Sequence, residues 1–339
     1  MHRSEVTIDL GALRRNVRTL LRALRGAELW AVVKADAYGH GAADVAAAAL
    51  DAGAAALCVA TMPEALALRP GLADARILVM GPAADREIAQ AREARLELAV
   101  SSGPIPEGLP VHLKLDTGMG RWGFSELPAP PAGVVGLMSH LATADTDAAY
   151  AERQVQRFRA ATEPYAHLTR HIANSAAALR HPSARFDAAR CGIAIYGLSP
   201  FGTDPGEDGL EPVLSWTSQI AQTRLLRVGE STGYRRRFVA ERETWIGIVP
   251  VGYGDGFRRD LTGTTVLVAG APCPVVGIVS MDSFAVELEH DISVGSPVVL
   301  LGRGVLAEEH ARVAGTITYE LVCGISSEPT RARRVVLDA

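Results

Sequence analysis

The sequence lacks several features that define large classes of proteins. No apolar stretch reaches 18 residues without a charged residue, glycine or proline, so we expect no membrane-spanning helix. The first residues include early acids and no apolar core of signal length, so we expect no secretion signal. The net charge of −4 gives no bulk attraction to nucleic acid or to an anionic membrane.

Cysteine is also scarce. The four cysteines, Cys58, Cys191, Cys273 and Cys323, stand far apart in the sequence and form no CxxC pair. Such spacing fits neither a zinc cluster nor a disulfide framework, so the sequence predicts no metal site and favours the reducing cytoplasm.

Lysine is the scarcest charged residue. Only Lys34 and Lys114 occur among the 34 basic residues, and the rest are arginine. A lysine can lose its proton, form a Schiff base or be carbamylated, whereas arginine stays protonated. Composition alone leaves two interpretations open: chance survival of two lysines on a solvated face, or chemistry that arginine cannot perform.

The chain has 339 residues with 48% apolar and 21% charged residues, which indicates a globular protein of about two domains. Short apolar runs alternate with helical patterns over the first two thirds. The expected strands are 29–37, 55–61, 76–81, 96–102, 110–118, 133–142, 167–175 and 191–198, and the expected helices are 10–24, 40–52, 63–69, 84–94 and 146–162. Eight strands alternating with helices predict an α/β fold, a (β/α)8 barrel of the TIM type.

Two connections in this pattern are too short for a helix. Residues 102–109 and 125–133 are broken by proline, so we expect the outer helices after the fourth and fifth strands to be shortened or missing. After about residue 211, strands separated by glycine and proline turns predict a C-terminal mostly-β domain. The predicted domains are residues 1–211 and 212–339.

Lys34 lies near the C-terminal end of the first expected barrel strand, where barrel enzymes keep their reacting groups. Burial beside such a strand lowers the pKa of a lysine and frees its amine, as an aldehyde cofactor requires for a Schiff base. Tyr38 follows four residues later, within reach of an anionic group at the same barrel mouth.

The segment around Lys34, AVVKADAYGHG, resembles the pyridoxal 5'-phosphate (PLP) lysine segment of the alanine racemases. Further motifs follow in the order of that family: KLDTGMGRWGF (114–124), SHLATAD (139–145), HIANSAA (171–177), RCGIAIYGL (190–198), VPVGYGDGF (249–257), VSMDSF (279–284) and GTITYEL (315–321). The resemblance covers essentially the whole chain. It implies a homodimeric PLP enzyme that interconverts L- and D-alanine, a small-molecule substrate, and supplies D-alanine for peptidoglycan.

The resemblance also assigns roles in proton transfer. Lys34 would hold the cofactor and act as base on one face of Cα, while Tyr234 from the β domain of the partner subunit would act on the other. His140 would be the neighbour of Tyr234. Arg190 would face the pyridine nitrogen and, because arginine does not give up its proton, leave that nitrogen unprotonated.

The remaining roles concern binding. Arg121 would lie near the phenolic oxygen of the cofactor and the substrate carboxylate, and Lys114 is the position that many family members carbamylate to orient this arginine. Substrate contacts from the partner would come from the backbone N–H of Met281 and the adjacent Asp282. The other cofactor contacts would be Tyr38, Asn174, Ser175, the backbone N–H groups of Gly192 and Ile193, and Tyr253 at the entrance.

Several features leave alternatives open. GMGRWG (118–123) fits a dinucleotide fingerprint, but a proline-rich segment follows where a helix is required. His140 and His171 are also compatible with buried core histidines, and His171 receives no role. Arg235 stands where glycine is usual in the family, and Ser327 stands where many relatives have tyrosine, which would widen the pocket.

Three other activities therefore remain as alternatives: a racemase of serine or a broader range of amino acids, a barrel-type PLP decarboxylase, and a non-enzymatic PLP-binding protein. Such decarboxylases usually carry a cysteine acid in the β domain, but Cys273 and Cys323 lie in no motif of that kind. The binding proteins are typically a lone barrel, and the predicted β domain argues against them.

Overall fold

The structure, a computed structural model, describes residues 3–338. It divides into two compact units, each described by itself. The barrel unit comprises Ala12–Phe201 and Gly206–Glu211. The β unit comprises the residues up to Gly11, Gly202–Pro205, and the residues from Pro212 onward.

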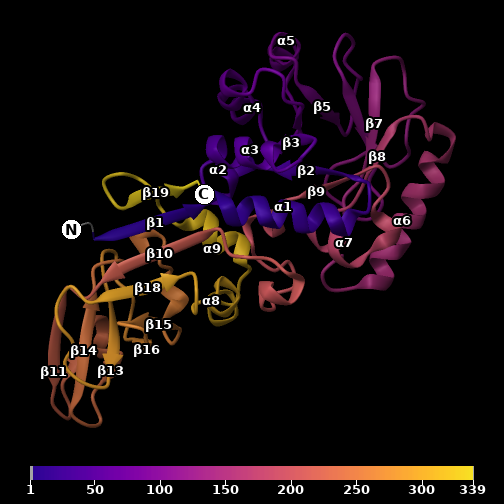
Figure 1. The fold of residues 1–339 in the computed structure, drawn as a ribbon. Coiled ribbons are helices and arrows are strands. Elements are labelled where there is room, and N and C mark those ends of the chain that lie inside the picture. Colours follow the sequence, from indigo (N-terminus) through magenta and orange to yellow (C-terminus); the bar gives the residue numbers. More distant parts are fainter. Residues whose placement is uncertain (1–2, 339) are drawn as a thin grey trace. The chain divides into compact units, whose positions relative to one another are not determined.

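The barrel unit is built around eight parallel strands that close in chain order, which confirms the predicted barrel (Figure 1). The strands are β2 (Glu28–Val32), β3 (Ala56–Val59), β4 (Ile77–Val79), β5 (Glu97–Val100), β6 (Val111–Lys114), β7 (Val134–Met138), β8 (Thr169–His171) and β9 (Ala188–Cys191). The barrel closes where β9 pairs with β2, and Trp30 lies opposite Arg190 in that register.

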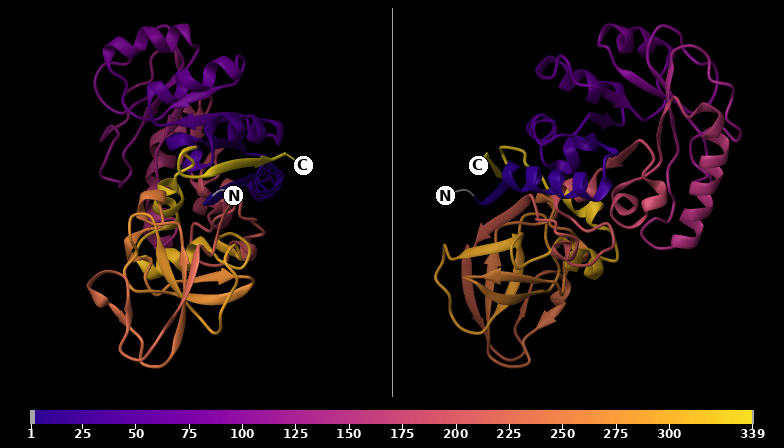
Figure 2. Two further views of the ribbon diagram at one scale, coloured as in Figure 1. Left: turned by 90° about the vertical axis from the view of Figure 1, so that its left-hand side faces the viewer. Right: turned by 45° about the vertical axis from the view of Figure 1, so that its right-hand side comes forward.

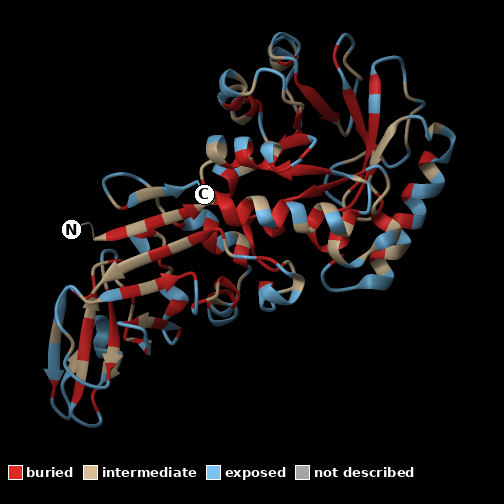
Figure 3. Cartoon of the chain, viewed as in Figure 1, coloured by how far each residue is buried: buried red, intermediate tan, exposed pale blue. Residues whose placement is uncertain are grey.

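Helices cover the outside of the barrel, and the opening helix α1 (Leu10–Leu24) has the predicted bounds. Its buried residues Leu13, Val17, Leu20 and Leu24 recur at the helical period, and the alternation of buried and exposed bands along α1 is visible in Figure 3. The other helices are α3 (Ala42–Asp51), α4 (Met62–Leu68), α5 (Asp85–Glu93), α6 (Ala148–Thr162) and α7 (Ser175–Arg180), with the single turns η1 (Arg69–Gly71), η2 (Glu163–Tyr165), η3 (Pro182–Ala184), η4 (Ile193–Tyr196) and η5 (Pro205–Asp208).

The structure contains no helix in residues 101–110 or 115–133, which confirms that the outer helices after the fourth and fifth barrel strands are missing. The proline-broken segments leave β5 and β6 without the usual helical cover.

The last barrel strand is displaced from its predicted position. The prediction of 191–198 was wrong, because the strand is Ala188–Cys191 and η4 occupies Ile193–Tyr196. The apolar run of 193–196 resembles a strand by composition, whereas the true strand has no β-branched residue. The turn is fixed at its end by Tyr196, whose hydroxyl donates to the Val32 carbonyl oxygen at 2.7 Å.

The β unit is a nine-stranded sheet in the order β11-β14-β17-β16-β15-β18-β10-β1-β19, drawn in two further views in Figure 2. Its strands are β1 (Ser4–Asp9), β10 (Leu214–Gln219), β11 (Gln222–Leu226), β14 (Thr244–Val249), β15 (Thr265–Val268), β16 (Ala271–Val276), β17 (Phe284–Leu288), β18 (Pro297–Leu301) and β19 (Arg333–Leu337). A separate hairpin joins β12 (Ser231–Thr232) to β13 (Phe238–Val239), and the single turns are η6 (Tyr234–Arg236), η7 (Tyr253–Asp255) and η8 (Arg259–Leu261). The predicted mostly-β domain is confirmed.

Two features of this unit were not predicted. β1, from the start of the chain, pairs antiparallel with β10 and parallel with β19. Two short helices, α8 (Ala307–Ala314) and α9 (Thr318–Gly324), interrupt the strands. No helix within residues 3–338 is both long enough and apolar enough to cross a membrane.

Candidate active site

Lys34 opens a strained segment at the C-terminal end of β2. It begins the turn α2 (Lys34–Gly39), in which Ala35, Asp36, Ala37 and Tyr38 all have φ between 51° and 55°. A left-handed conformation is unfavourable by about 1–2 kcal/mol for each L-residue without special compensation. Such a run persists only where the surroundings fix it, and it is typical of functional sites.

Glu64, in the first turn of α4, provides that fixation. Its Oε1 accepts a hydrogen bond from the backbone N–H of Ala35 at 2.8 Å, and its Oε2 accepts from the N–H groups of Ala60 at 2.7 Å and Thr61 at 3.0 Å. One carboxylate thus joins the strained turn to the next barrel connection. The sequence analysis missed Glu64, although its spacing from Thr61 is that of a capping box.

A group of hydrogen-bonding atoms suited to an anion lies beside Tyr38. A Cβ added to Gly192 would come within 2.5 Å of the buried Tyr38 hydroxyl oxygen, so a larger residue there would require the tyrosine to shift. The Ser175 hydroxyl accepts from the backbone N–H groups of Gly192 at 3.1 Å and Ala194 at 3.3 Å, which flank Ile193. Hydroxyls and N–H groups gathered in this way can hold a phosphate. Asn174 accepts from the Ala177 N–H at 3.0 Å and caps α7.

Arg190 is buried inside the barrel, where its guanidinium is held by carbonyl oxygens and a histidine ring. Its Nη2 donates to the Ser139 carbonyl oxygen at 2.6 Å, and its Nη1 donates to the carbonyl oxygen of His171 at 2.9 Å and to the ring Nδ1 of the same residue at 2.6 Å. Within residues 3–338, Arg190 forms no ion pair with a carboxylate, and its hydrogen-bond contacts all use Nη1 or Nη2 and not Nε. Burial lowers the pKa of its guanidinium to about 10.

The surroundings of Arg190 are crowded with positive charge. Burial, followed by the charges of Arg190 and Arg121, lowers the pKa of Lys114 to about 8. Burial, followed by the charges of Arg190 and Lys114, lowers the pKa of His140 to about 3, so His140 is neutral at physiological pH. Several buried cations gathered in this way suit a ligand with several negative charges.

The loop after β6 places Arg121 at this site. The carboxylate of Asp116 accepts from the backbone N–H groups of Gly118 at 2.8 Å, Met119 at 2.8 Å and Gly120 at 2.9 Å, which folds the glycine-rich segment into a tight turn. The guanidinium of Arg121 and the amine of Lys114 both lie over the Trp122 ring, at 5.4 and 5.5 Å from its centroid. Because no helix follows, the dinucleotide interpretation of GMGRWG is excluded.

The β unit carries the second set of predicted residues. Tyr234 is 67% exposed and lines a cavity of about 660 Å³ together with Arg235, Tyr253, Arg259, Val279 and Ser280. Arg235 has φ 58°, again a left-handed conformation directly after a candidate base. The N–H of Tyr253 donates to the Ser280 carbonyl oxygen at 3.0 Å, and the N–H of Gly254 donates to that of Met281 at 2.9 Å, so these two loops are joined.

Asp282 belongs to a network of ion pairs in the β unit. Its carboxylate lies 3.0 Å from Arg331, and Arg331 and Arg3 each lie 2.9 Å from the buried Asp255. Its side chain therefore fixes the Met281 loop within the unit, in addition to the substrate contact that the sequence predicts.

The fold and the two sets of residues define a class: barrel enzymes with a lysine at the strand ends and a separate β unit that presents further site residues. Comparison with known proteins gives the particular family. Residues 8–200 match the model of "Alanine racemase, N-terminal domain", and residues 213–335 match that of "Alanine racemase, C-terminal domain". The chain belongs to the alanine racemase family.

Individual relatives agree over nearly the full length. An alanine racemase of Levilactobacillus brevis is 38% identical over 372 aligned positions, which cover 98% of this chain and 99% of the relative. The biosynthetic alanine racemase of Pseudomonas aeruginosa superposes with a TM-score of 0.92 at 37% identity and covers all of both chains. The alanine racemase of Streptomyces coelicolor A3(2) superposes with a TM-score of 0.90 at 38% identity and covers 99% of this chain and 98% of the other.

Proposed function

We propose that this chain is a PLP-dependent racemase that interconverts L- and D-alanine, with each active site built from two copies. The observation that carries the proposal is the site around Lys34: a lysine on a strained turn that Glu64 clamps, with the buried cations Lys114 and Arg190 in the same barrel. The family supplies the substrate, because the relatives named above are alanine racemases.

The residues present fit the cofactor. Tyr38, Ser175 and the backbone at Gly192 and Ile193 would hold its phosphate, and Lys34 would hold its aldehyde carbon. The Nε–H of Arg190, which the contacts described above do not use, suits a ring nitrogen that accepts a hydrogen bond and carries no proton. When bound, the cofactor withdraws electrons from the amino-acid Cα, which allows the Cα hydrogen to leave as a proton.

Inversion at Cα requires two bases on opposite faces. Lys34 Nζ is the base on one face, and the Tyr234 hydroxyl of a second copy is the base on the other. The exposure of Tyr234 leaves its hydroxyl available to another molecule. His140, neutral because of burial and the cations around it, is the hydrogen-bond partner that the barrel offers to this hydroxyl.

Lys114 and Arg121 bind the negative charges of the substrate. With its pKa at about 8, part of the Lys114 amine is neutral near physiological pH and open to carbon dioxide. A carbamate on Lys114 would place a negative charge in the cluster and orient the guanidinium of Arg121 toward the substrate carboxylate. The partner's Met281 N–H would meet the same carboxylate, and the partner's Tyr253 would close the entrance.

The test is exchange of the Cα hydrogen in deuterated water, with alanine, serine and lysine offered separately to the purified protein. We expect exchange with inversion on alanine. Exchange on serine but not on alanine would identify a serine racemase, carbon dioxide release would identify a decarboxylase, and no exchange on any substrate would identify a binding protein. We place the enzyme as a homodimer in the bacterial cytoplasm, where its product would supply peptidoglycan synthesis.

A further inference from the structure

A chain of polar side chains crosses the barrel interior below Arg190, in positions that barrels usually fill with valine, isoleucine and leucine. We call it the barrel relay: Arg190, His171, His112, Glu97 and Arg76. The successive contacts are 2.6 Å from Arg190 Nη1 to His171 Nδ1, 2.9 Å from His171 Nε2 to His112 Nδ1, 2.8 Å from His112 Nε2 to Glu97 Oε2, and 2.8 Å from Glu97 Oε1 to Arg76 Nε. Glu97 is the first residue of β5, so the relay connects the site to the opposite, N-terminal end of the strands.

The direction of every hydrogen bond in the barrel relay is fixed by its two ends. Arginine only donates, so the Nδ1 of His171 accepts and its Nε2 carries the proton. That proton is donated to the Nδ1 of His112, whose Nε2–H is then donated to the carboxylate of Glu97. Only neutral Nε2–H histidines satisfy all four contacts while Glu97 is ionised.

The charge states agree with this pattern. Burial alone would raise the pKa of Glu97, but its hydrogen bonds from His112 and Arg76 lower it to about 2. Burial lowers the pKa of His112 despite the opposing hydrogen bond and charge of Glu97. Burial, followed by the charge of Arg190, lowers the pKa of His171 well below its ordinary value. At neutral pH the carboxylate is therefore ionised and both rings are neutral.

The packing holds the two rings in place. His112 and His171 have no exposed surface, and the Trp30 ring lies against both, at 5.5 and 4.5 Å between centroids. On the neighbouring strand β7, a Cβ at Gly136 would clash with the His112 Nδ1, so the strand carries glycine where the ring needs space. The relay is a constrained arrangement and has little freedom to repack.

We propose that Glu97 is a positioning residue for the reaction: through His112 and His171, its carboxylate fixes the acceptor that orients the Arg190 guanidinium. This inference rests on the proposed function in one respect, the placement of Arg190 against the cofactor ring. Without Glu97, either histidine can adopt the other tautomer, and an Nδ1–H on His171 would face the Arg190 Nη1–H across 2.6 Å. Arg190 would then turn away from its present orientation.

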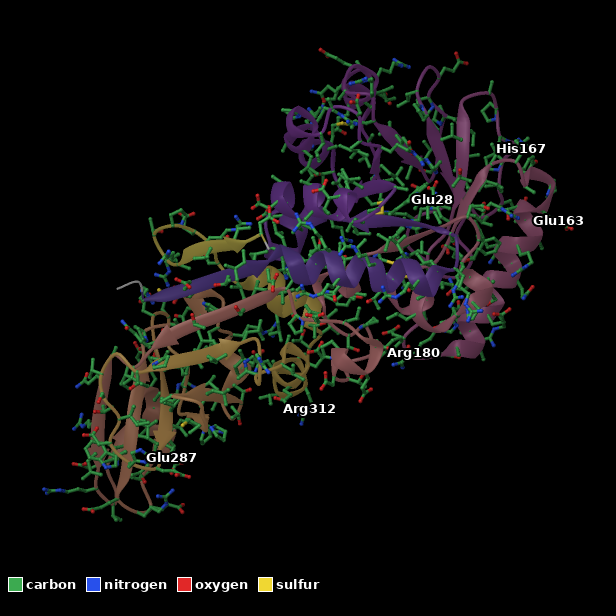
Figure 4. All side chains as sticks on the ribbon, in the orientation of Figure 1. Glu28, Glu163, His167, Arg180, Glu287 and Arg312 are labelled. Carbon is green, nitrogen blue, oxygen red and sulfur yellow. The ribbon has the colours of Figure 1, made fainter. Side chains whose placement is uncertain are left out.

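Glu97→Gln is the informative substitution. Three donors face Glu97, from His112 and from the Nε and Nη2 of Arg76, and a glutamine offers them a single acceptor oxygen. The matched control is Glu28→Gln. Glu28, labelled in Figure 4, also lies within ion-pair distance of Arg76 at 3.5 Å, but its remaining side-chain hydrogen bond is from Trp30 and not from a histidine.

We expect the kcat of Glu97→Gln for alanine to fall on the order of 100-fold, the loss that a small misplacement of a catalytic group causes, with KM changed by less than about threefold. Glu28→Gln should keep a kcat near that of the unmodified enzyme. His112→Gln breaks the barrel relay while Glu97 stays paired with Arg76, and should lose kcat as Glu97→Gln does. Equal kcat values for Glu97→Gln and Glu28→Gln would overturn the proposal.

A second readout needs neither turnover nor a variant. Histidine ¹⁵N spectra of the cofactor-free protein should show His112 and His171 as neutral Nε2–H tautomers at neutral pH. An Nδ1–H tautomer or a protonated ring at either position would overturn the proposal, even if Glu97→Gln fails to fold. If the protein neither binds the cofactor nor exchanges the alanine Cα hydrogen, the proposed function fails, whereas these spectra still decide whether the two rings have the tautomers that the barrel relay requires.

Discussion

The two units place their site residues in opposite environments. In the barrel unit, Lys114 and Arg190 are 5% and 4% exposed, and burial shifts the pKa of each. In the β unit, Tyr234 and Met281 are 67% and 54% exposed. The charged groups of the barrel unit are withdrawn from water, whereas the β unit holds a phenol at its surface. The proposed function assigns the cover of this exposed phenol to a second copy.

Both halves nevertheless use left-handed backbone next to a candidate base. In the barrel unit the residues after Lys34 are held by Glu64. In the β unit, Arg235 follows Tyr234, and the next residue, Arg236, donates to the Gly229 carbonyl oxygen at 3.0 Å and the Ser231 hydroxyl at 3.1 Å. In each unit, contacts that fix the residues following the base give the base a defined position, although Tyr234 is exposed and the barrel residues are buried.

The largest expected effect comes from replacing the candidate base of each unit, because only the base of the barrel unit should be needed to bind the cofactor. Lys34→Ala should lower racemisation by at least about 10²–10⁴-fold and abolish the yellow absorbance of the bound cofactor. Tyr234→Phe should impair proton exchange from one enantiomer far more than from the other and keep the yellow absorbance. Absorbance spectra and exchange rates of both variants check this. Persistent colour in Lys34→Ala would show that another residue holds the cofactor.

The clamp on the strained turn is tested by paired substitutions. Glu64→Gln and Glu87→Gln each remove the charge of a glutamate in the first turn of a helix that accepts from the backbone N–H three residues earlier, so each should destabilise its helix by about 0.5 kcal/mol. Only Glu64 also accepts from the Ala35 N–H next to Lys34. Cofactor titration should therefore show affinity about tenfold weaker in Glu64→Gln, since a displaced lysine binds less well. Equal affinities in the two variants would mean that the turn needs no clamp.

Burial in the barrel half predicts a dependence of stability on acid. His140 has a folded pKa of about 3, so between that value and its ordinary value the unfolded chain binds a proton that the folded chain does not. Stability therefore falls as pH drops below about 6.5, by up to about 1.4 kcal/mol per pH unit for each such histidine. Urea unfolding from pH 7 to pH 4 should show a shallower slope for His140→Gln. The control is His167→Gln, the same substitution at an exposed position labelled in Figure 4.

The smallest expected effect is the change in stability when Arg235, the left-handed residue after Tyr234, is replaced by glycine. Arg235→Gly removes a Cβ from a residue at φ 58° and should stabilise the protein by about 1 kcal/mol in denaturant unfolding. A loss of stability would show that the Arg235 side chain makes contacts worth more than the strain.

Local sequence patterns predicted much of the fold. Most of the elements that the sequence did not predict depend on pairing between distant segments. The apolar period of residues 10–24 defined α1, and the prolines of 102–109 and 125–133 showed where helices are missing. β1 and β9 were not found, because β1 is defined by pairing with strands about 200 or more residues away and β9 is four residues long without β-branched side chains.

The site was predictable only where a residue lies in a motif. Tyr38, Ser175 and Gly192 lie together in the barrel unit, as their motifs predict, although their ligand is a proposal. Glu64 and Glu97 were missed, because each acts through backbone or histidine contacts that form only when separate strands of the barrel meet. His171, to which the sequence assigned no role, gains one only through its contacts with Arg190 and His112.

The central claim, that one copy provides the lysine and another the phenol, is tested most directly by mixing two inactive proteins. Lys34→Ala and Tyr234→Phe are each prepared separately, combined in equal amounts and allowed to exchange subunits, with exchange verified by native mass spectrometry. Random pairing in a two-fold symmetric dimer makes about half of the dimers mixed, each with one intact site, so about one quarter of the unmodified activity should return. Full exchange without recovery would contradict the account, because it would place Lys34 and Tyr234 in the same copy's active site.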